Sequence, residues 1–207
     1  MNQVYIIDFE DSFTYNIAAY FHKLNIATKV ISYTSIEASL NDLSDDRKKV
    51  LIWGPGPKHP YQYQEIMIIL NFLRQNERIF HMGICLGHQI MLASEGYSIV
   101  PATDIIHGQK IDIIIPEWDT FFDQGLQNKS MAVQRYNSLA VQEKSNNKIK
   151  SYIIDQEVMI AGYHNGVSYQ FHPESIGTSF PDAFFDSTLK FLYNVKDGRN
   201  TQNSRYI

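Results

Sequence analysis

The stretch Arg78-Ile79-Phe80-His81-Met82-Gly83-Ile84-Cys85-Leu86-Gly87 decides the fold that we expect for this chain. Its first half, 78–82, is typical of a buried strand, and the residues from Gly87 to about 95 are predicted to form a helix. Gly83 and Gly87 allow a sharp turn between the two elements, which would lift Cys85 above the end of the sheet. The spacing glycine, any residue, nucleophile, any residue, glycine is typical of a nucleophile elbow.

Short strands and helices alternate on the N-terminal side of this turn. The predicted strands are 4–7, 28–33, 50–53 and 78–82, and the predicted helices are 13–24, 63–73 and 87–95. Asp11 and Ser12 are candidates to cap the first helix. Alternation of this kind indicates a parallel sheet with helices on both faces.

The pattern changes after Gly96. Strands separated by turns are predicted at 105–115, 131–134, 148–154, 158–163 and 167–171, followed by a helix over 181–193 with Pro181 in its first turn. We therefore predict an α/β fold with a mostly parallel central sheet flanked by helices and a mixed or antiparallel extension. Residues 1–195 are predicted to form one domain and 196–207 a polar C-terminal tail.

Composition excludes several classes of protein. The chain has 207 residues, of which 44% are hydrophobic, and a formal net charge of −4, so it can bury a core and lacks the basic excess typical of nucleic-acid binders. Its single cysteine, Cys85, excludes an internal disulfide and fits a reducing compartment. We see neither a secretory leader nor an apolar run of about 20 residues, so we expect a cytoplasmic protein without a membrane partner.

Cys85 is the candidate nucleophile. The positive end of the helix that follows it favours a thiolate, and the backbone N–H of Leu86 would point at an oxyanion formed on an attacked carbonyl. The alternative is a buried cysteine that packs as a small apolar residue. The two flanking glycines favour the catalytic interpretation.

A nucleophilic thiol needs a base, and His172 is the best candidate. It follows a predicted strand, Pro173 restricts the backbone after it, and Glu174 can hold one ring nitrogen while the other faces the sulfur. His88 follows Cys85 by three residues on the predicted helix, where we expect a structural role. No histidine or cysteine spacing typical of a metal site is present, so no metal is predicted.

Two motifs resemble those of the class I, triad-type glutamine amidotransferases: 82–89 around the cysteine and 171–175 around the histidine. A third, 8–16 (Asp-Phe-Glu-Asp-Ser-Phe-Thr-Tyr-Asn), is similar to the opening motif of the subset that serves chorismate-using synthases. Further matches to that subset are 54–57, 107–108 and 135–139. The motifs occur in the order of the family and span nearly the whole chain.

The resemblance implies a reaction on L-glutamine. Cys85 would attack the side-chain amide to form a thioester, His172 would transfer the protons, and Glu174 would orient His172. The oxyanion would be bound by the backbone N–H groups of Gly56 and Leu86. A glycine at 56 also permits close backbone approach to a substrate, whatever the family.

The resemblance also implies a glutamine-binding set, which consists of Gly56, Gln89, Ser138 and Leu139. Leu139 would act through its backbone, with its side chain in the core. Three positions depart from the subset: Lys58 replaces a glycine of the glutamine loop, Asn137 replaces a common histidine, and Ile111 lies near a usual small hydroxyl residue. If the glycine at 58 had a positive φ, the lysine would be strained there, and its bulk would narrow the pocket.

The resemblance implies a glutaminase subunit that supplies ammonia to a chorismate-aminating synthase component I. We favour anthranilate synthase, in tryptophan biosynthesis; aminodeoxychorismate synthase, in folate biosynthesis, or a subunit shared by both remains the alternative. A non-catalytic binding or regulatory subunit is the alternative of another class. The chain itself would need no cofactor, since magnesium would belong to the partner synthase. Residues 8–16 could either rigidify a helix start or contact that partner.

Overall fold

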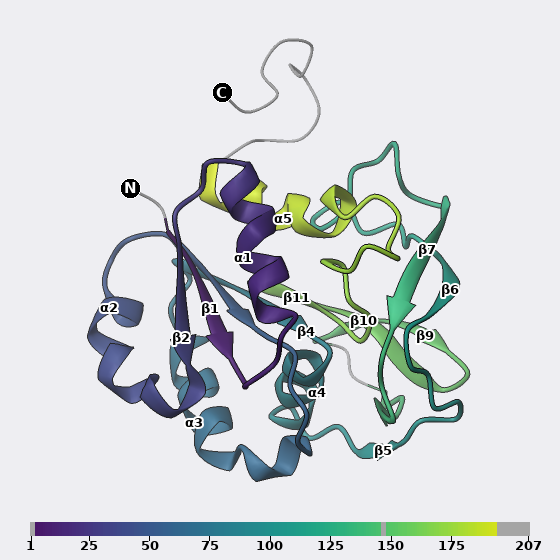
Figure 1. Cartoon of the computed structure of the whole chain (residues 1–207), viewed down its shortest axis with the longest axis horizontal. Coiled ribbons are helices and arrows are strands. Elements are labelled where there is room, and N and C mark those ends of the chain that lie inside the picture. The colour runs from purple at the N-terminus through teal and green to yellow at the C-terminus, as the bar shows by residue number, and fades with distance from the viewer. Residues whose placement is uncertain (1–2, 146–147, 194–207) are drawn as a thin grey trace.

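A computed structural model describes residues 3–145 and 148–193 of the chain (Figure 1). A seven-stranded sheet runs through its centre in the order β2-β1-β3-β4-β11-β10-β9. In that order the strands are β2 (Thr28–Ser32), β1 (Gln3–Asp8), β3 (Lys49–Trp53), β4 (Ile79–Ile84), β11 (Gly166–Tyr169), β10 (Glu157–Tyr163) and β9 (Lys150–Ile154).

The first five strands of this order are parallel, and β10 and β9 continue the sheet in antiparallel fashion. The predicted α/β fold, with its mostly parallel sheet and its mixed extension, is therefore confirmed. Two small antiparallel pairs lie outside this sheet. They are β5 (Ile99–Pro101) with β8 (Leu139–Val141), and β6 (Gln109–Ile114) with β7 (Ser130–Arg135).

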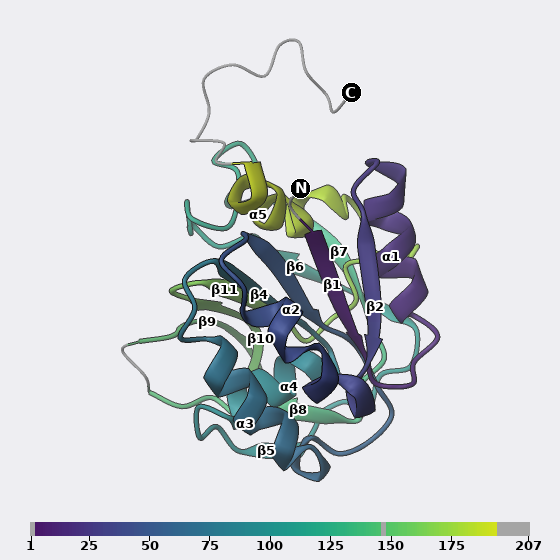
Figure 2. The ribbon, with the colours of Figure 1, turned by 90° about the vertical axis from the view of Figure 1, so that its left-hand side faces the viewer.

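Helices cover both faces of the sheet (Figures 1 and 2). α1 (Thr14–Lys23) and α5 (Asp182–Tyr193) pack on one face, and α2 (Leu40–Ser44), α3 (Gln64–Leu73) and α4 (Leu86–Ala93) on the other. Three 3-10 turns complete the fold: η1 (Tyr33–Ser35), η2 (Glu37–Ser39) and η3 (Pro60–Gln62).

The alternation of side chains along β1 explains why both faces are apolar. Val4 and Ile6 belong to the core beneath α1 and α5, whereas Tyr5 and Ile7 belong to the core beneath α3 and α4, and all four are buried. A strand buried on both faces reads as a continuous apolar run, as this one does. The helices are thus held by burial on each side of one sheet.

Two departures from the sequence predictions have a clear local cause. The strand expected over 105–115 begins only at Gln109, because Gly108 has a φ of +71° and turns the chain just before it. The caps expected at the first helix are not formed: α1 begins at Thr14, and the Asp11 carboxylate instead accepts a hydrogen bond from the N–H of Phe13, just before the helix (2.8 Å).

The carboxyl ends of the parallel strands carry the segments that the sequence singled out. The loop 9–13 follows β1, the loop 54–57 follows β3, Cys85 follows β4, and His172 lies three residues after β11. Open α/β sheets form their sites at this edge. The predicted tail, 196–207, lies outside the described residues.

In the part of the chain that the structure describes, no helix has the length and apolar character needed to cross a membrane.

Candidate active site

The turn at Cys85 has the strained geometry of a nucleophile elbow. Cys85 has φ 52° and ψ −106°, a conformation that a non-glycine residue rarely adopts, and the α4 helix begins at the next residue. A Cβ at Gly83 would lie 2.6 Å from the sulfur of Met91, and one at Gly87 would lie 1.9 Å from the carbonyl oxygen of Trp53. Close contacts therefore exclude a side chain at both positions, whereas the sequence pointed only to the sharp turn that the glycines allow.

The structure brings Cys85, His172 and Glu174 together. Nδ1 of His172 lies 2.7 Å from Oε1 of Glu174. The His172 and Glu174 side chains are 2% and 0% exposed, and Cys85 is 8% exposed. Nε2 of His172 is buried and has no nitrogen or oxygen partner among the described residues, so it is the ring nitrogen left for the sulfur.

Electrostatics at this site favour a charged imidazole. Burial alone would lower the pKa of His172, but the neighbouring Cys85 and Glu174, with the hydrogen bond between Nδ1 and Glu174, raise it well above its usual value. The imidazole therefore favours its protonated form, next to the cysteine at the elbow.

Gly56 and Leu86, the two predicted oxyanion donors, lie side by side. A Cβ at Gly56 would be 2.5 Å from Cδ2 of Leu86 and 2.7 Å from Cβ of Phe9, so only glycine fits. The N–H of Gly87 donates to the carbonyl of Gly54 (3.1 Å), which holds the loop against the elbow. The loop after β3 and the start of α4 thus form one wall of the site.

The remaining predicted glutamine ligands lie beside α4. Nε2 of Gln89 donates to the carbonyl of Leu139 (2.9 Å) and to Oε1 of the buried Gln170 (3.1 Å). The Leu139 side chain is only partly buried, and Ser138 is exposed, with its carbonyl accepting from the N–H of Ala102 (3.0 Å). The segment that includes Ser138 and Leu139 is therefore tied to the nucleophile helix through Gln89.

Sequence reasoning missed two aromatic neighbours of the histidine. The rings of Phe13 and Tyr136 each lie 5.0 Å from the His172 ring, centroid to centroid, and 4.9 Å from each other. Both residues stood inside the quoted motifs, but no sequence pattern indicates a contact between segments so far apart. Their proximity to His172 is visible only in three dimensions.

Lys58 is not strained. It is not among the described residues with a positive φ, so the condition under which a lysine would be strained there is not met. Its ammonium lies 3.3 Å from the hydroxyl oxygen of Tyr33 and 3.8 Å from Oε2 of Glu10, outside the triad. Asn137 is buried and bridges Nε of Arg135 (3.0 Å) and the carbonyl of Leu139 (3.0 Å), so it fixes the turn before β8.

His88 has the structural role that the sequence predicted. Its Nδ1 lies 2.8 Å from the Ser168 hydroxyl and its Nε2 lies 2.8 Å from the Val158 carbonyl, and burial lowers its pKa to about 4. It joins α4 to β10 and β11. Among the described residues, no group of three histidine, cysteine or acidic side chains could hold a metal ion.

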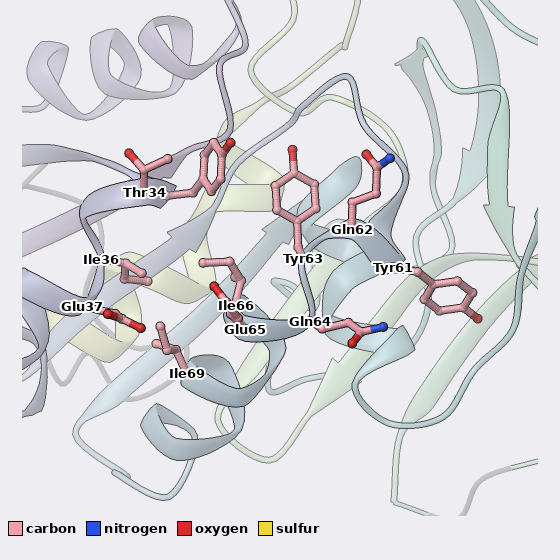
Figure 3. Close-up of a pocket in the computed structure, with 11 residues that line it drawn as sticks. Thr34, Ile36, Glu37, Tyr61, Gln62, Tyr63, Gln64, Glu65, Ile66 and Ile69 are labelled. Carbon is pink, nitrogen blue, oxygen red and sulfur yellow. The ribbon is translucent and has the colours of Figure 1, made fainter.

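A separate pocket of about 570 Å³ lies between η1 and α3 (Figure 3). Figure 3 shows Glu37, Tyr63 and Glu65 among the side chains at this pocket. None of the predicted site residues lines it. The Tyr33 ring connects it to the site loops, because it lies 5.7 Å from the Phe9 ring, and Phe9 packs against Gly56.

Comparisons with known proteins agree with this geometry. The chain is 30% identical to anthranilate synthase component 2 of Vibrio parahaemolyticus, over 92% of this chain and 96% of that protein. It is 32% identical to anthranilate synthase component 2 of Saccharolobus solfataricus, over 94% and 97% of the two chains.

Solved structures show the same fold at lower sequence identity. A Thermoplasma acidophilum protein described as part of a GMP synthase superposes with a TM-score of 0.77 at 18% identity, over 94% of this chain and 95% of that one. A glutamine amidotransferase of Thermotoga maritima superposes with a TM-score of 0.60 at 16% identity, over 83% and 76% of the two chains.

The sequence also matches the family described as glutamine amidotransferase class-I over residues 5–191, which include the elbow, the histidine and the glutamate. Family, fold and site geometry agree, and this chain belongs to the class-I glutamine amidotransferases.

Proposed function

We propose that this chain is the glutaminase subunit of an anthranilate synthase, with Cys85, His172 and Glu174 as its catalytic residues. The single observation that carries the proposal is the meeting of these three side chains at the elbow of a class-I amidotransferase. The names of the relatives support the choice of synthase.

The proposed reaction begins with attack on glutamine. The Cys85 sulfur adds to the side-chain amide carbon, and the N–H groups of Gly56 and Leu86 stabilise the oxyanion. The C–N bond then breaks as His172 gives its proton to the leaving nitrogen, which departs as ammonia. The product of this half is a thioester between Cys85 and the glutamyl group.

Water completes the cycle. His172, now neutral, takes a proton from a water molecule as the water oxygen adds to the thioester carbon. The C–S bond breaks, glutamate leaves, and the thiolate and imidazolium are restored. Glu174 holds Nδ1 throughout, which keeps Nε2 directed at the reacting atoms. Gln89, Ser138 and Leu139 complete the proposal as the residues that bind the amino-acid end of glutamine.

A partner synthase would receive the ammonia. Large apolar side chains are exposed next to the site residues: Tyr15, two residues after Phe13, is 64% exposed, and Ile176, two residues after Glu174, is fully exposed. We propose that these two side chains belong to the surface that contacts the synthase. Such a contact would enclose the ammonia between the two active sites.

The proposal assigns magnesium and chorismate to the synthase, since no step above uses a cofactor. It places the reaction in the cytoplasm, where a reducing environment keeps a nucleophilic thiol free.

The experiment is a product assay with two synthase components from the same source. The chain is mixed with component I of anthranilate synthase, or with that of aminodeoxychorismate synthase, together with chorismate, magnesium and glutamine. We expect glutamine-dependent 2-aminobenzoate with the first. Aminodeoxychorismate with the second alone would contradict the proposed synthase, and both products would mean a shared subunit.

A further inference from the structure

Two aromatic rings pack against the imidazole of His172. The Phe13 ring meets it at an interplanar angle of 57° and the Tyr136 ring at 78°, both at 5.0 Å between centroids. The two rings also contact each other at 4.9 Å. His172 is thus held from the β1–α1 connection and from the end of β7 at once.

The backbone that carries Phe13 is firmly fixed. Oδ1 of Asp8 accepts hydrogen bonds from the N–H groups of Glu10 (3.1 Å) and Asp11 (3.3 Å) and from the Thr14 hydroxyl (2.8 Å). The Asp11 carboxylate accepts from the N–H of Phe13 itself. The polar residues of the opening motif therefore hold one aromatic ring in place.

Tyr136 is fixed through the loop that follows His172. Its hydroxyl lies 3.3 Å from the Ser175 hydroxyl, which donates to Oε1 of Gln134 (2.5 Å). The N–H of His172 donates to the carbonyl of Gln134 (2.9 Å). Both aromatic rings are therefore positioned by bonds that do not involve the imidazole.

Aromatic rings close to a cation stabilise it through their quadrupoles, and the effect grows where water is excluded. The titratable groups that face His172 are Cys85 just before α4, Glu174 on its own loop and Tyr136 after β7. Glu174 carries the opposite charge, and the rings of Tyr136 and Phe13 pack against the imidazole. Uncharged aromatic contacts in a buried site would add to the preference for imidazolium.

We propose that Phe13 and Tyr136 are positioning residues that clamp the His172 imidazole and favour its protonated form, and through it the thiolate of Cys85. The inference rests on the proposed roles of Cys85 and His172, and it gives the opening motif a function inside the site. Phe13 would connect the exposed start of α1 to the catalytic base.

The test is the pH profile of Cys85 alkylation by iodoacetamide, which is unambiguous because the chain has one cysteine. Removing a ring destabilises the imidazolium, so thiolate formation needs a higher pH. For Phe13→Leu and Tyr136→Leu we expect the midpoint of the profile to rise by about half a pH unit to one unit. Phe13→Tyr and Tyr136→Phe, which keep the rings, should retain the midpoint of the unmodified chain.

Phe72→Leu on α3 is the matched control, because Phe72 is 61% exposed and lies on the opposite face of the sheet from α1. Thermal unfolding of each variant identifies those that fold. If Phe13→Leu does not fold, the midpoint of Tyr136→Leu tests the clamp. Unchanged midpoints in the folded leucine variants would overturn the clamp. An equal shift in Tyr136→Phe would also overturn it, because the hydroxyl rather than the ring would then be responsible.

Iodoacetamide needs no glutamine site, so the two proposals can fail separately. If the midpoints shift as predicted but the chain does not hydrolyse glutamine, the clamp is supported and the proposed function is refuted. If the chain hydrolyses glutamine but the midpoints do not shift, the function is supported and the clamp is refuted.

Discussion

Glu174 determines, at the scale of single residues, how the charges of the site are arranged. Its side chain is fully buried and one carboxylate oxygen holds Nδ1 of His172, while the other is buried without a partner among the described residues. A buried carboxylate in this position fixes the ring and stabilises its positive charge. Its removal should therefore affect both the rate and its pH dependence.

We predict that Glu174→Gln lowers kcat for glutamine hydrolysis by about 10²- to 10⁴-fold, because the imidazole loses its orienting charge. The same change lowers the pKa of His172, so imidazolium is lost at a lower pH than in the unmodified chain. Glutamate release measured across the pH range checks both effects. Glu143→Gln, at an exposed glutamate, is the control, and equal activity of the two variants would refute the role of Glu174.

The proximity of Cys85, His172 and Glu174 agrees with the sequence analysis, because each lies in a short motif, and their catalytic roles stay a prediction. Phe13 and Tyr136 could not be assigned to the histidine, since their contact depends on how β1 and β7 are placed in the fold. Strain at Lys58 depended on a positive φ, which the sequence cannot show and which the backbone there does not have.

Two buried histidines act at the scale of secondary-structure elements. His88 joins α4 to β10 and β11, and His81 on β4 accepts a hydrogen bond from the Trp53 indole on β3 (3.1 Å). Burial lowers the pKa of His88 to about 4 and that of His81 to about 3. Both are therefore neutral in the folded chain at pH values where they are charged in the unfolded chain.

Stability should consequently fall as the pH falls. Between an unfolded-state pKa of about 6.5 and the folded values, the unfolded chain binds more protons, so each histidine removes up to about 1.4 kcal/mol per pH unit from the free energy of unfolding. His172 has the opposite effect, because its pKa is raised in the folded chain. It stabilises the folded chain at low pH, and this contribution is lost as the pH rises through its folded pKa.

Urea unfolding at pH 7, 6 and 5 measures this dependence. The free energy of unfolding should fall less steeply with falling pH in His88→Gln than in the unmodified chain. In His164→Gln, at a side chain that is 86% exposed, this pH dependence should be unchanged. The same pH dependence in all three chains would contradict the burial of a neutral His88.

Element boundaries were predictable wherever apolar periodicity is strong, as along β1 and α3. They were not predictable where backbone geometry decides. The apolar residues of 105–115 predict one strand, but the first part of this segment is a loop that ends at Gly108. The strands β5 and β8 pair with each other. Each has only three residues, which is too short for an alternation of apolar and polar side chains to be recognised in the sequence.

At the scale of the whole molecule, the proposed function requires that the chain supplies ammonia and that a partner carries out the amination. The site lies at the carboxyl edge of the sheet, and exposed Tyr15 and Ile176 follow its two loops. A change confined to the sulfur should therefore abolish the ammonia supply without disturbing the partner's chemistry.

Cys85→Ala in the complex with anthranilate synthase component I is the most direct test. The rate of 2-aminobenzoate formation is measured with glutamine and, separately, with ammonium as the nitrogen source. We predict that the variant loses the glutamine-dependent rate to background and keeps the ammonium-dependent rate of the unmodified complex. Undiminished synthesis from glutamine by a folded, assembled Cys85→Ala complex would contradict the account, because the nitrogen would then be released without the Cys85 thioester.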